Sequence, residues 1–332
     1  EGATNIAKTV YENITQDCSG LKLAAVFTDN MVLQRNQPIT IYGTANGGDV
    51  VEVSFKSQKK SATTNQYGKW EVVFPAQTHG GHYEVTIKSN QKNIVLKNIL
   101  IGDVWFCSGQ SNMAFQLQQS ENGNEEIKKA LPNTAIRLFN FKDLRETDNT
   151  VWDSITLAKT NQLEFFSGSW SVCDSISAKD FSAIAYYFGK NIAHAENIPV
   201  GLIQVAVGGS PIESWIDRYT LEHDDKVVDV LTNWRRSDFI MPWVRERANM
   251  NLKNATNAKQ RHPYDPSYNF EAGVTAFTKF PIKGVIWYQG ESNAHNVELY
   301  EHLMPTLVES WRQAWGTNLP FYYVQLSSIE RP

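Results

Sequence analysis

The chain has 332 residues, of which 42% are hydrophobic and 20% are charged, and its formal net charge is −4. The hydrophobic content is sufficient for a large folded core, and the length favours two domains or one large one. The near-neutral charge offers no extended basic surface for nucleic acid, and no apolar run approaches the roughly 18 residues of a membrane-spanning helix. We therefore expect neither nucleic acid nor a membrane as a partner.

Residues 1–20 are polar and weakly patterned, and we expect them to form a loosely attached N-terminal arm. Between residues 21 and 101, short runs rich in β-forming residues alternate with turn signals, which predicts a small antiparallel β-sandwich domain. Such a domain either binds carbohydrate or only packs against its neighbour, and the sequence leaves both open. The expected strands are 23–27, 39–43, 50–55, 70–74, 83–87 and 94–100.

From residue 102 to residue 332, buried strands alternate with helices, which predicts a three-layer α/β domain with a mainly parallel sheet. Residues 152–173 are expected to be a loop, and the polar segment 222–270 is expected to be an insertion over the functional site. The expected strands are 104–107, 135–141, 200–207, 282–288 and 319–326. The expected helices are 114–130, 182–196 and 297–315, the last interrupted near Pro305.

The three cysteines have no spacing typical of metal ligands, and we expect no metal site. Cys107 lies in an apolar strand and is expected to be a small buried side chain. Cys18 and Cys173 are the candidate disulfide pair.

A serine follows the first strand of the α/β part at a position typical of a nucleophile. The apolar run ends at Ser108-Gly109, and Ser111 comes where a polar segment begins. A sharp turn after a strand exposes the serine Oγ, and nearby backbone N–H groups can face a developing oxyanion. The sequence Gly109-Gln110-Ser111-Asn112 differs from the G-x-S-x-G turn that carries the nucleophile in many serine enzymes.

Two further strands are expected to end in turns of small and polar residues, at 208–211 and 289–293. Because ligands bind at the carboxyl ends of parallel strands, the three turns are expected to converge. Gly209 lacks a Cβ, so its N–H can approach a bound oxygen, and the carboxamide of Gln289 or Asn293 could donate a further hydrogen bond. The predicted substrate-binding residues are Gln110, Ser210 and Glu291. The Glu291 carboxylate is expected to accept hydrogen bonds from backbone N–H groups or from substrate hydroxyls.

Three segments resemble the SGNH-hydrolase superfamily, and within it the sialate O-acetylesterases and related carbohydrate acetylesterases. They are Trp105-Phe-Cys-Ser-Gly-Gln-Ser-Asn-Met113, Val207-Gly-Gly-Ser-Pro-Ile-Glu-Ser-Trp215 and Gly284-Val-Ile-Trp-Tyr-Gln-Gly-Glu-Ser-Asn293. In addition, Phe27-Thr-Asp-Asn-Met-Val-Leu-Gln34 resembles the start of the β-domain that precedes the hydrolase domain in these proteins. The resemblance implies an SGNH-type, flavodoxin-like fold for residues 102–332.

The same resemblance implies the roles of the site residues. Ser111 would be the nucleophile, and the oxyanion hole would combine the N–H groups of Ser111 and Gly209 with a side chain from the turn 289–293. Gln289 and Asn293 are both candidates for that side chain. The implied reaction is hydrolysis of an acetyl ester on a sugar hydroxyl, through an acetyl-enzyme and without a metal or another cofactor.

The general base of the family lies in an Asp-x-x-His segment after the last strands of the domain, and this chain departs from that pattern. None of its seven histidines has an aspartate three residues earlier. We expect the segment to be missing through truncation or processing, or to come from a second polypeptide. His295 and His302 follow the third motif and are the alternative bases. Without a base, the attack of serine is expected to be feeble.

The favoured substrate is 9-O-acetylated sialic acid, and acetylated xylan or another polysaccharide is the alternative. Because sialate carries a carboxylate, a cation near the site would favour it, and Arg218 and Arg261 are the candidates. A carbohydrate-binding protein that keeps the fold but lacks turnover is the alternative from another functional class. We expect a secreted or periplasmic protein.

Overall fold

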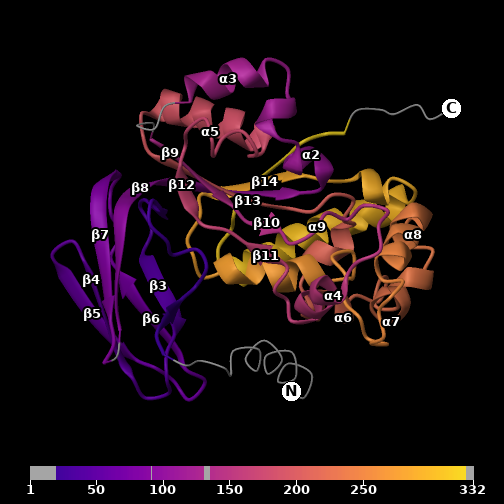
Figure 1. The fold of residues 1–332 in the computed structure, drawn as a ribbon, viewed down its shortest axis with the longest axis horizontal. Coiled ribbons are helices and arrows are strands. Elements are labelled where there is room, and N and C mark those ends of the chain that lie inside the picture. The colour runs from indigo at the N-terminus through magenta and orange to yellow at the C-terminus, as the bar shows by residue number, and fades with distance from the viewer. Residues whose placement is uncertain (1–19, 91, 131–134, 327–332) are drawn as a thin grey trace.

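The computed structural model describes residues 20–90, 92–130 and 135–326, and its architecture is mixed α/β (Figure 1). A ten-stranded mixed sheet runs through the molecule, beside a three-stranded antiparallel sheet near the N-terminus and a two-stranded ribbon. Nearly all of the expected N-terminal arm lies outside the described residues. Cys18 lies there as well, so the disulfide to the buried Cys173 stays a prediction.

The N-terminal strands include the antiparallel ones that the alternating pattern predicts. Those of the three-stranded sheet are β1 (Lys22–Leu23), β3 (Ile39–Thr44) and β6 (Lys69–Phe74). Those that join the large sheet are β2 (Val32–Gln34), β4 (Val50–Phe55), β5 (Gln58–Thr63), β7 (Gly80–Lys88) and the first half of β8 (Asn93–Gly109).

The second half of β8 is the centre of a parallel sheet. β13 (Val200–Ala206) pairs with it on one side and β14 (Gly284–Tyr288) on the other. Beyond β13 lies β9 (Ile136–Asn140), also parallel, followed by the antiparallel edge strand β12 (Trp170–Val172). Beyond β14 lies the parallel strand β15 (Phe321–Tyr323). The ribbon consists of β10 (Lys142–Asp143) and β11 (Phe166–Ser167).

Helices cover both faces of this sheet (Figure 1). On one face lie α2 (Ser111–Ala114), η1 (Leu117–Gln119), α3 (Gly123–Lys129) and α5 (Ala183–Glu196). On the other lie α4 (Ser154–Asn161), η2 (Ile212–Trp215), α6 (Arg218–Glu222), α7 (Val230–Asn233), η3 (Trp234–Arg236), α8 (Pro242–Asn251), η4 (Phe270–Val274), η5 (Thr275–Phe277) and α9 (Val297–Trp315). The short η6 (Glu291–Asn293) follows β14.

Successive residues of the central strands alternate between the two cores. Trp105 and Cys107 of β8 pack with the α5 side, whereas Phe106 packs with Trp311 of α9 on the other side. Burial on both faces explains why these strands read as continuous apolar runs in the sequence. The larger core extends without interruption into the N-terminal sheets.

The boundary predicted at residues 101/102 falls inside β8, which is continuous there. Asp103 is buried at this point and accepts hydrogen bonds from Gln34 Nε2 at 3.0 Å and Arg35 Nε at 2.9 Å. Tyr42 also donates from the N-terminal part to the carbonyl of Ala276, at 2.8 Å. These contacts tie the N-terminal strands to the α/β part; the division into domains stays a prediction.

Among the local expectations that are wrong, two have a physical explanation. Residues 152–173 are not one loop, because they include two short strands and the helix α4. The Asp153 side chain stabilises the start of α4 by accepting a hydrogen bond from Thr156 N at 2.8 Å. α9 is continuous through Pro305. Its apolar face buries Leu299, Leu303, Leu307 and Trp311 at spacings of four residues, and this packing outweighs the hydrogen bond that proline removes.

Candidate active site

Three strands of the parallel sheet end at one level. Gly109, the last residue of β8, lies opposite Ala206 of β13 and opposite Tyr288 of β14. The turns that follow these strands therefore start side by side at the carboxyl edge of the sheet, as the sequence predicts. This register brings the segments that carry Ser111, Gly209 and Gln289 together.

Gly109 allows the chain to turn sharply here. Its φ is +145°, and an added Cβ would lie 2.0 Å from the carbonyl oxygen of Tyr288. The next residue, Gln110, donates its N–H to that same oxygen at 3.0 Å, and Val207 N–H binds the Gly109 carbonyl at 3.2 Å. A side chain at this position would force the strands apart, so the turn depends on glycine.

Ser111 is exposed at the start of α2 and lines a cleft of about 720 Å³. The same cleft is lined by Gln110, Gly209 and Glu291 from the three turns. No described residue forms a hydrogen bond with Ser111 Oγ. The hydroxyl is therefore open to a substrate that enters the cleft.

Two side chains from other parts of the chain fix the Gly208-Gly209 turn by hydrogen bonds. Both Tyr264 OH and Thr147 Oγ1 donate to the Gly208 carbonyl, at 2.7 and 2.6 Å. Gly209 has a φ of +71°, and a Cβ there would lie 2.4 Å from Tyr264 Oη and 3.0 Å from the Trp243 ring. Fixing the Gly208 carbonyl also fixes the direction of the Gly209 N–H, because both belong to the same planar peptide.

The third turn is fastened to the second through buried carboxamides. Gln289 Nε2 donates to Asn293 Oδ1 at 2.8 Å and to the Ser210 carbonyl at 3.2 Å. Asn293 Oδ1 also accepts from Ile212 N at 2.9 Å, and its Nδ2 donates to Glu213 Oε2 at 3.0 Å. Neither carboxamide lines the cleft, because both bind other parts of the protein. Their part in the oxyanion hole stays a prediction.

The three predicted substrate contacts differ in position. Gln110 lines the cleft, but its Oε1 accepts from the backbone N–H groups of Gly290 and Ser292 at 3.3 and 3.4 Å. Ser210 is buried, and its Oγ accepts from Trp215 Nε1 at 2.9 Å. Glu291 lines the cleft and accepts from Asn112 Nδ2. These contacts hold the turns in place, and Gln110 and Glu291 are the two of the three that line the cleft.

All seven histidines lie within the described residues, and none of them lines the cleft. His295 Nε2 lies 3.2 Å from the Asp238 carbonyl, and His302 Nε2 lies 2.6 Å from Asp224 Oδ2. The two alternative bases thus have partners elsewhere. The described residues bring no imidazole to Ser111.

The cleft carries five carboxylates and two cations, Lys142 and Arg247. Burial, aided by repulsion from Glu146, raises the pKa of Asp143 to about 6. The carboxylates are Asp143, Glu146, Asp148, Asp180 and Glu291.

Arg218 and Arg261 line a different cavity, so the expected position of a cation near Ser111 is wrong for both. Trp243 and Arg247 of α8 line the cleft in their place, with the guanidinium 4.8 Å from the centre of the indole ring. Their spacing of four residues puts them on one face of the helix. The sequence predicts that the segment 222–270 covers the site but does not identify these two residues.

Within the described part of the chain, no group of three or more His, Cys, Asp or Glu side chains could hold a metal ion. In the same residues, no helix has the length and apolar character needed to cross a bilayer.

A parallel α/β sheet with an exposed serine at a strand end is an arrangement found in ester hydrolases. The family described as "Carbohydrate esterase, sialic acid-specific acetylesterase" matches residues 101–236 and 254–332. The chain belongs to this family.

Individual proteins with related names are similar to most of this chain. The sialate O-acetylesterase of Rattus norvegicus is 28% identical over 93% of this chain, and that of Homo sapiens is 26% identical over 93%. A crystal structure of a carbohydrate acetylesterase from Xanthomonas citri matches 92% of the chain with a TM-score of 0.70 and 26% identity. The chain spans about 60% of the length of these relatives: 60% of the rat protein, 58% of the human protein and 60% of the bacterial chain.

The fully buried Glu213 gives the turn network a measurable pH dependence. Burial raises the pKa of its carboxyl from 4.5 to about 7, and the hydrogen bond from Asn293 opposes this shift only in part. Between these values the unfolded chain loses the proton while the folded protein keeps it. The free energy of unfolding therefore falls as pH rises through this window, by about 3 kcal/mol from this group.

Glu213→Gln removes this titration, so the stability of the variant relative to the parent should rise from pH 4.5 to pH 8. Urea unfolding at a series of pH values measures the difference. Glu301→Gln, at an exposed position of α9, is the matched control and should show no such trend. A Glu213→Gln difference that stays flat across this range would contradict the buried, protonated state.

Proposed function

We propose that this protein is a serine esterase that removes O-acetyl groups from carbohydrate, with Ser111 as nucleophile. The observation that carries the proposal is the register at Gly109, which brings an exposed serine and the Gly208-Gly209 turn to one cleft. Membership of the carbohydrate esterase family supports the same reaction class. In this proposal the α/β part, residues 102–332, is an SGNH-type hydrolase domain and residues 21–101 form its β-sandwich companion.

The reaction is ester hydrolysis in two steps. Ser111 Oγ attacks the acetyl carbonyl and gives its proton to a base, and the N–H groups of Ser111 and Gly209 bind the oxyanion. The sugar oxygen leaves and takes up a proton, which leaves an acetyl group on Ser111. Water then attacks this acetyl-enzyme, releases acetate and restores the serine. Gln289 or Asn293 is the proposed third donor, and no metal or other cofactor is required.

The base in this proposal is the histidine of an Asp-x-x-His segment, which the 332 residues do not contain and another stretch of polypeptide would supply. Its absence would leave a carbohydrate-binding protein with little turnover, which is the competing function. We further propose that the protein acts in a secreted or periplasmic setting, where such glycans are found.

The proposed substrate is 9-O-acetylated sialic acid, and acetylxylan or another acetylated polysaccharide is the alternative. Arg247 lines the cleft and is stacked on Trp243, so it offers a pre-positioned partner for the carboxylate of sialate. The names of the rat and human relatives favour the same substrate, whereas the bacterial structure is named only as a carbohydrate acetylesterase.

Ser111→Ala should abolish the release of acetate from 9-O-acetylated sialic acid, because the variant has no oxygen to acylate. Acetate can be measured enzymatically, with acetylated xylan as the second substrate. Ser57→Ala, at an exposed turn between β4 and β5, is the matched control and should behave like the parent. Equal rates for Ser111→Ala and the parent would remove Ser111 as the nucleophile.

Gly209→Ala should lower kcat by about 100-fold, because its Cβ would meet Tyr264 Oη and turn the N–H away from the oxyanion. Gly48 provides a control for backbone strain: its φ is +84°, and no atom lies within 4 Å of an added Cβ. Gly48→Ala should therefore lose stability without losing kcat. A Gly209→Ala protein with unchanged kcat would exclude this N–H from the oxyanion hole.

Arg247→Gln should raise KM for acetylated sialate about tenfold while leaving acetylated xylan unaffected, since only sialate has a carboxylate to lose its partner. Arg245→Gln is the control, because this residue lies on the same helix but does not line the cleft. If both substrates respond equally to Arg247→Gln, the arginine does not select for the carboxylate.

A further inference from the structure

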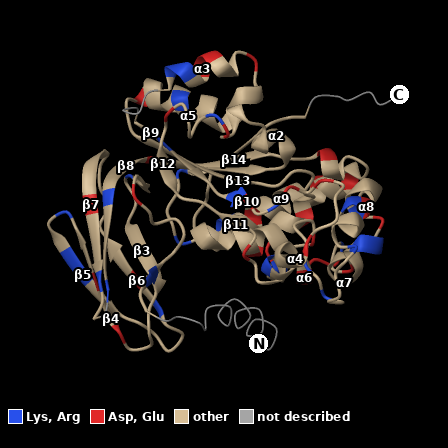
Figure 2. Cartoon of the chain, in the orientation of Figure 1, with Lys and Arg blue, Asp and Glu red and all other residues tan. Residues whose placement is uncertain are grey.

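A second cavity, of about 1020 Å³, lies among residues of α4, α6, α7, η3 and the loop that follows α8. It shares no lining residue with the Ser111 cleft. Charged residues of both signs gather around α4, α6 and α8 (Figure 2). Five cations but only two carboxylates line this cavity, so its lining has an excess of positive charge although the whole chain has a net charge of −4.

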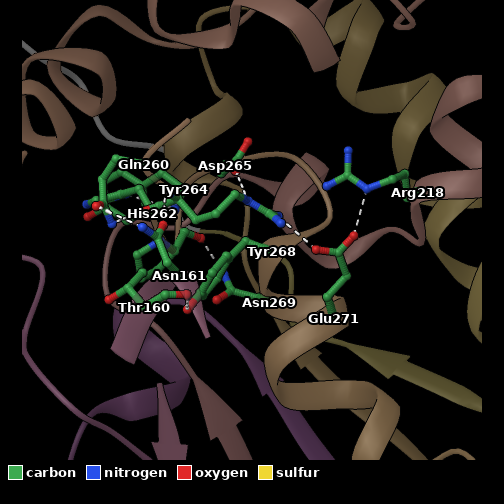
Figure 3. Close-up of polar contacts among 12 residues, drawn as sticks. Thr160, Asn161, Arg218, Gln260, His262, Tyr264, Asp265, Tyr268, Asn269 and Glu271 are labelled. Carbon is green, nitrogen blue, oxygen red and sulfur yellow. Dashed lines mark hydrogen bonds and ion pairs between the residues drawn. The ribbon is translucent and has the colours of Figure 1, made fainter. Parts of the chain in front are cut away.

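The two carboxylates are already neutralised. Glu271 accepts from Arg218 Nε at 2.7 Å through one oxygen and from Arg261 Nη2 at 2.8 Å through the other, and Asp265 pairs with Arg261 Nε (Figure 3). Glu271 thus holds two guanidinium groups close together. Within the described residues, the two terminal nitrogens of Arg218 have no hydrogen-bond acceptor, and its side chain is 28% exposed. These donors are available to a ligand.

The remaining cations lack an acidic partner. Arg236 and Lys259 are exposed, and no described residue contacts the charged end of either side chain. Arg235 has a single long hydrogen bond, from Nη1 to Asn249 Oδ1 at 3.4 Å. Three positive charges at the rim therefore have no counter-charge in the cavity wall.

Amide groups of the wall are held in fixed positions. Asn161 Nδ2 donates to Gln260 Oε1 at 3.1 Å (Figure 3). Gln260 Nε2 donates to the Leu157 carbonyl at 3.0 Å. Thr232 and Asn233 add further polar groups. A wall of amides, hydroxyls and guanidinium groups suits a ligand that combines an anion with many hydroxyls.

We propose that this cavity is a second, non-catalytic binding site for an acidic saccharide, recognised through the carboxylate of a sialic or uronic acid unit. The open terminal nitrogens of Arg218 and the unpaired cations Arg236 and Lys259 bind the carboxylate, and polar groups of the wall such as Asn233 bind the sugar hydroxyls. The inference that the ligand is a saccharide, and not another anion, rests on the proposed function. The positive charge of the cavity lining is independent of that function. Such a site would hold one unit of a glycan while acetylated units reach Ser111.

The test is binding to the Ser111→Ala protein, so that no ligand is turned over. Sialyllactose, trigalacturonate, lactose and inorganic phosphate are each titrated by calorimetry. At least one of the two acidic saccharides should bind about tenfold more tightly than lactose, and added salt should weaken it. Arg236→Gln combined with Lys259→Gln should reduce this affinity about tenfold, because two charge contacts are lost.

Two control variants make the outcome decisive. Arg247→Gln changes a cation of the Ser111 cleft, Lys253→Gln changes an exposed lysine outside both cavities, and both should leave this binding intact. Equal affinity for lactose, binding of phosphate alone, or a loss caused by Arg247→Gln but not by the Arg236/Lys259 pair would overturn the proposal. Acetate release by the parent protein tests the esterase separately, so failure of one leaves the other standing.

Discussion

Gly109 lies between two neighbouring strands, and the whole site depends on how closely their backbones approach it. Ala206 and Tyr288 lie opposite it, and the Tyr288 carbonyl occupies the space that a Cβ would need. Hydrogen bonding in a parallel sheet fixes the register, and the register fixes where each turn begins. Ser111 and Gly209 therefore face one cleft because of strand pairing.

Polar groups beneath the turns make the arrangement rigid. The carboxamides of Gln289 and Asn293 link the second and third turns, and the buried Glu213 holds Asn293 from below. Each buried polar group of this network removes a degree of freedom from the oxyanion region, which favours a site organised before substrate arrives. The raised pKa of Glu213 indicates that its carboxyl is protonated over much of the acidic range.

Sequence patterns predict the parts of this structure that depend on local chemistry. The apolar runs of β8, β13 and β14 and the small residues after them were sufficient to predict three converging turns. The sequence pattern does not predict the exposed strand β5, because its side chains are mostly polar and its structure depends on pairing with β4. Arg218 and Arg261 could not be assigned to a cavity from sequence, because their positions depend on ion pairs with Glu271 across the fold.

The most direct test of the account is to quench the protein with acid during turnover of an acetylated sugar and to map its peptides by mass spectrometry. The account predicts one acetyl group on the peptide that contains Ser111, and its loss when turnover is allowed to finish. Acetate release with the acetyl group on a different residue, or with no acetylated peptide in a quench fast enough to capture one, would contradict it.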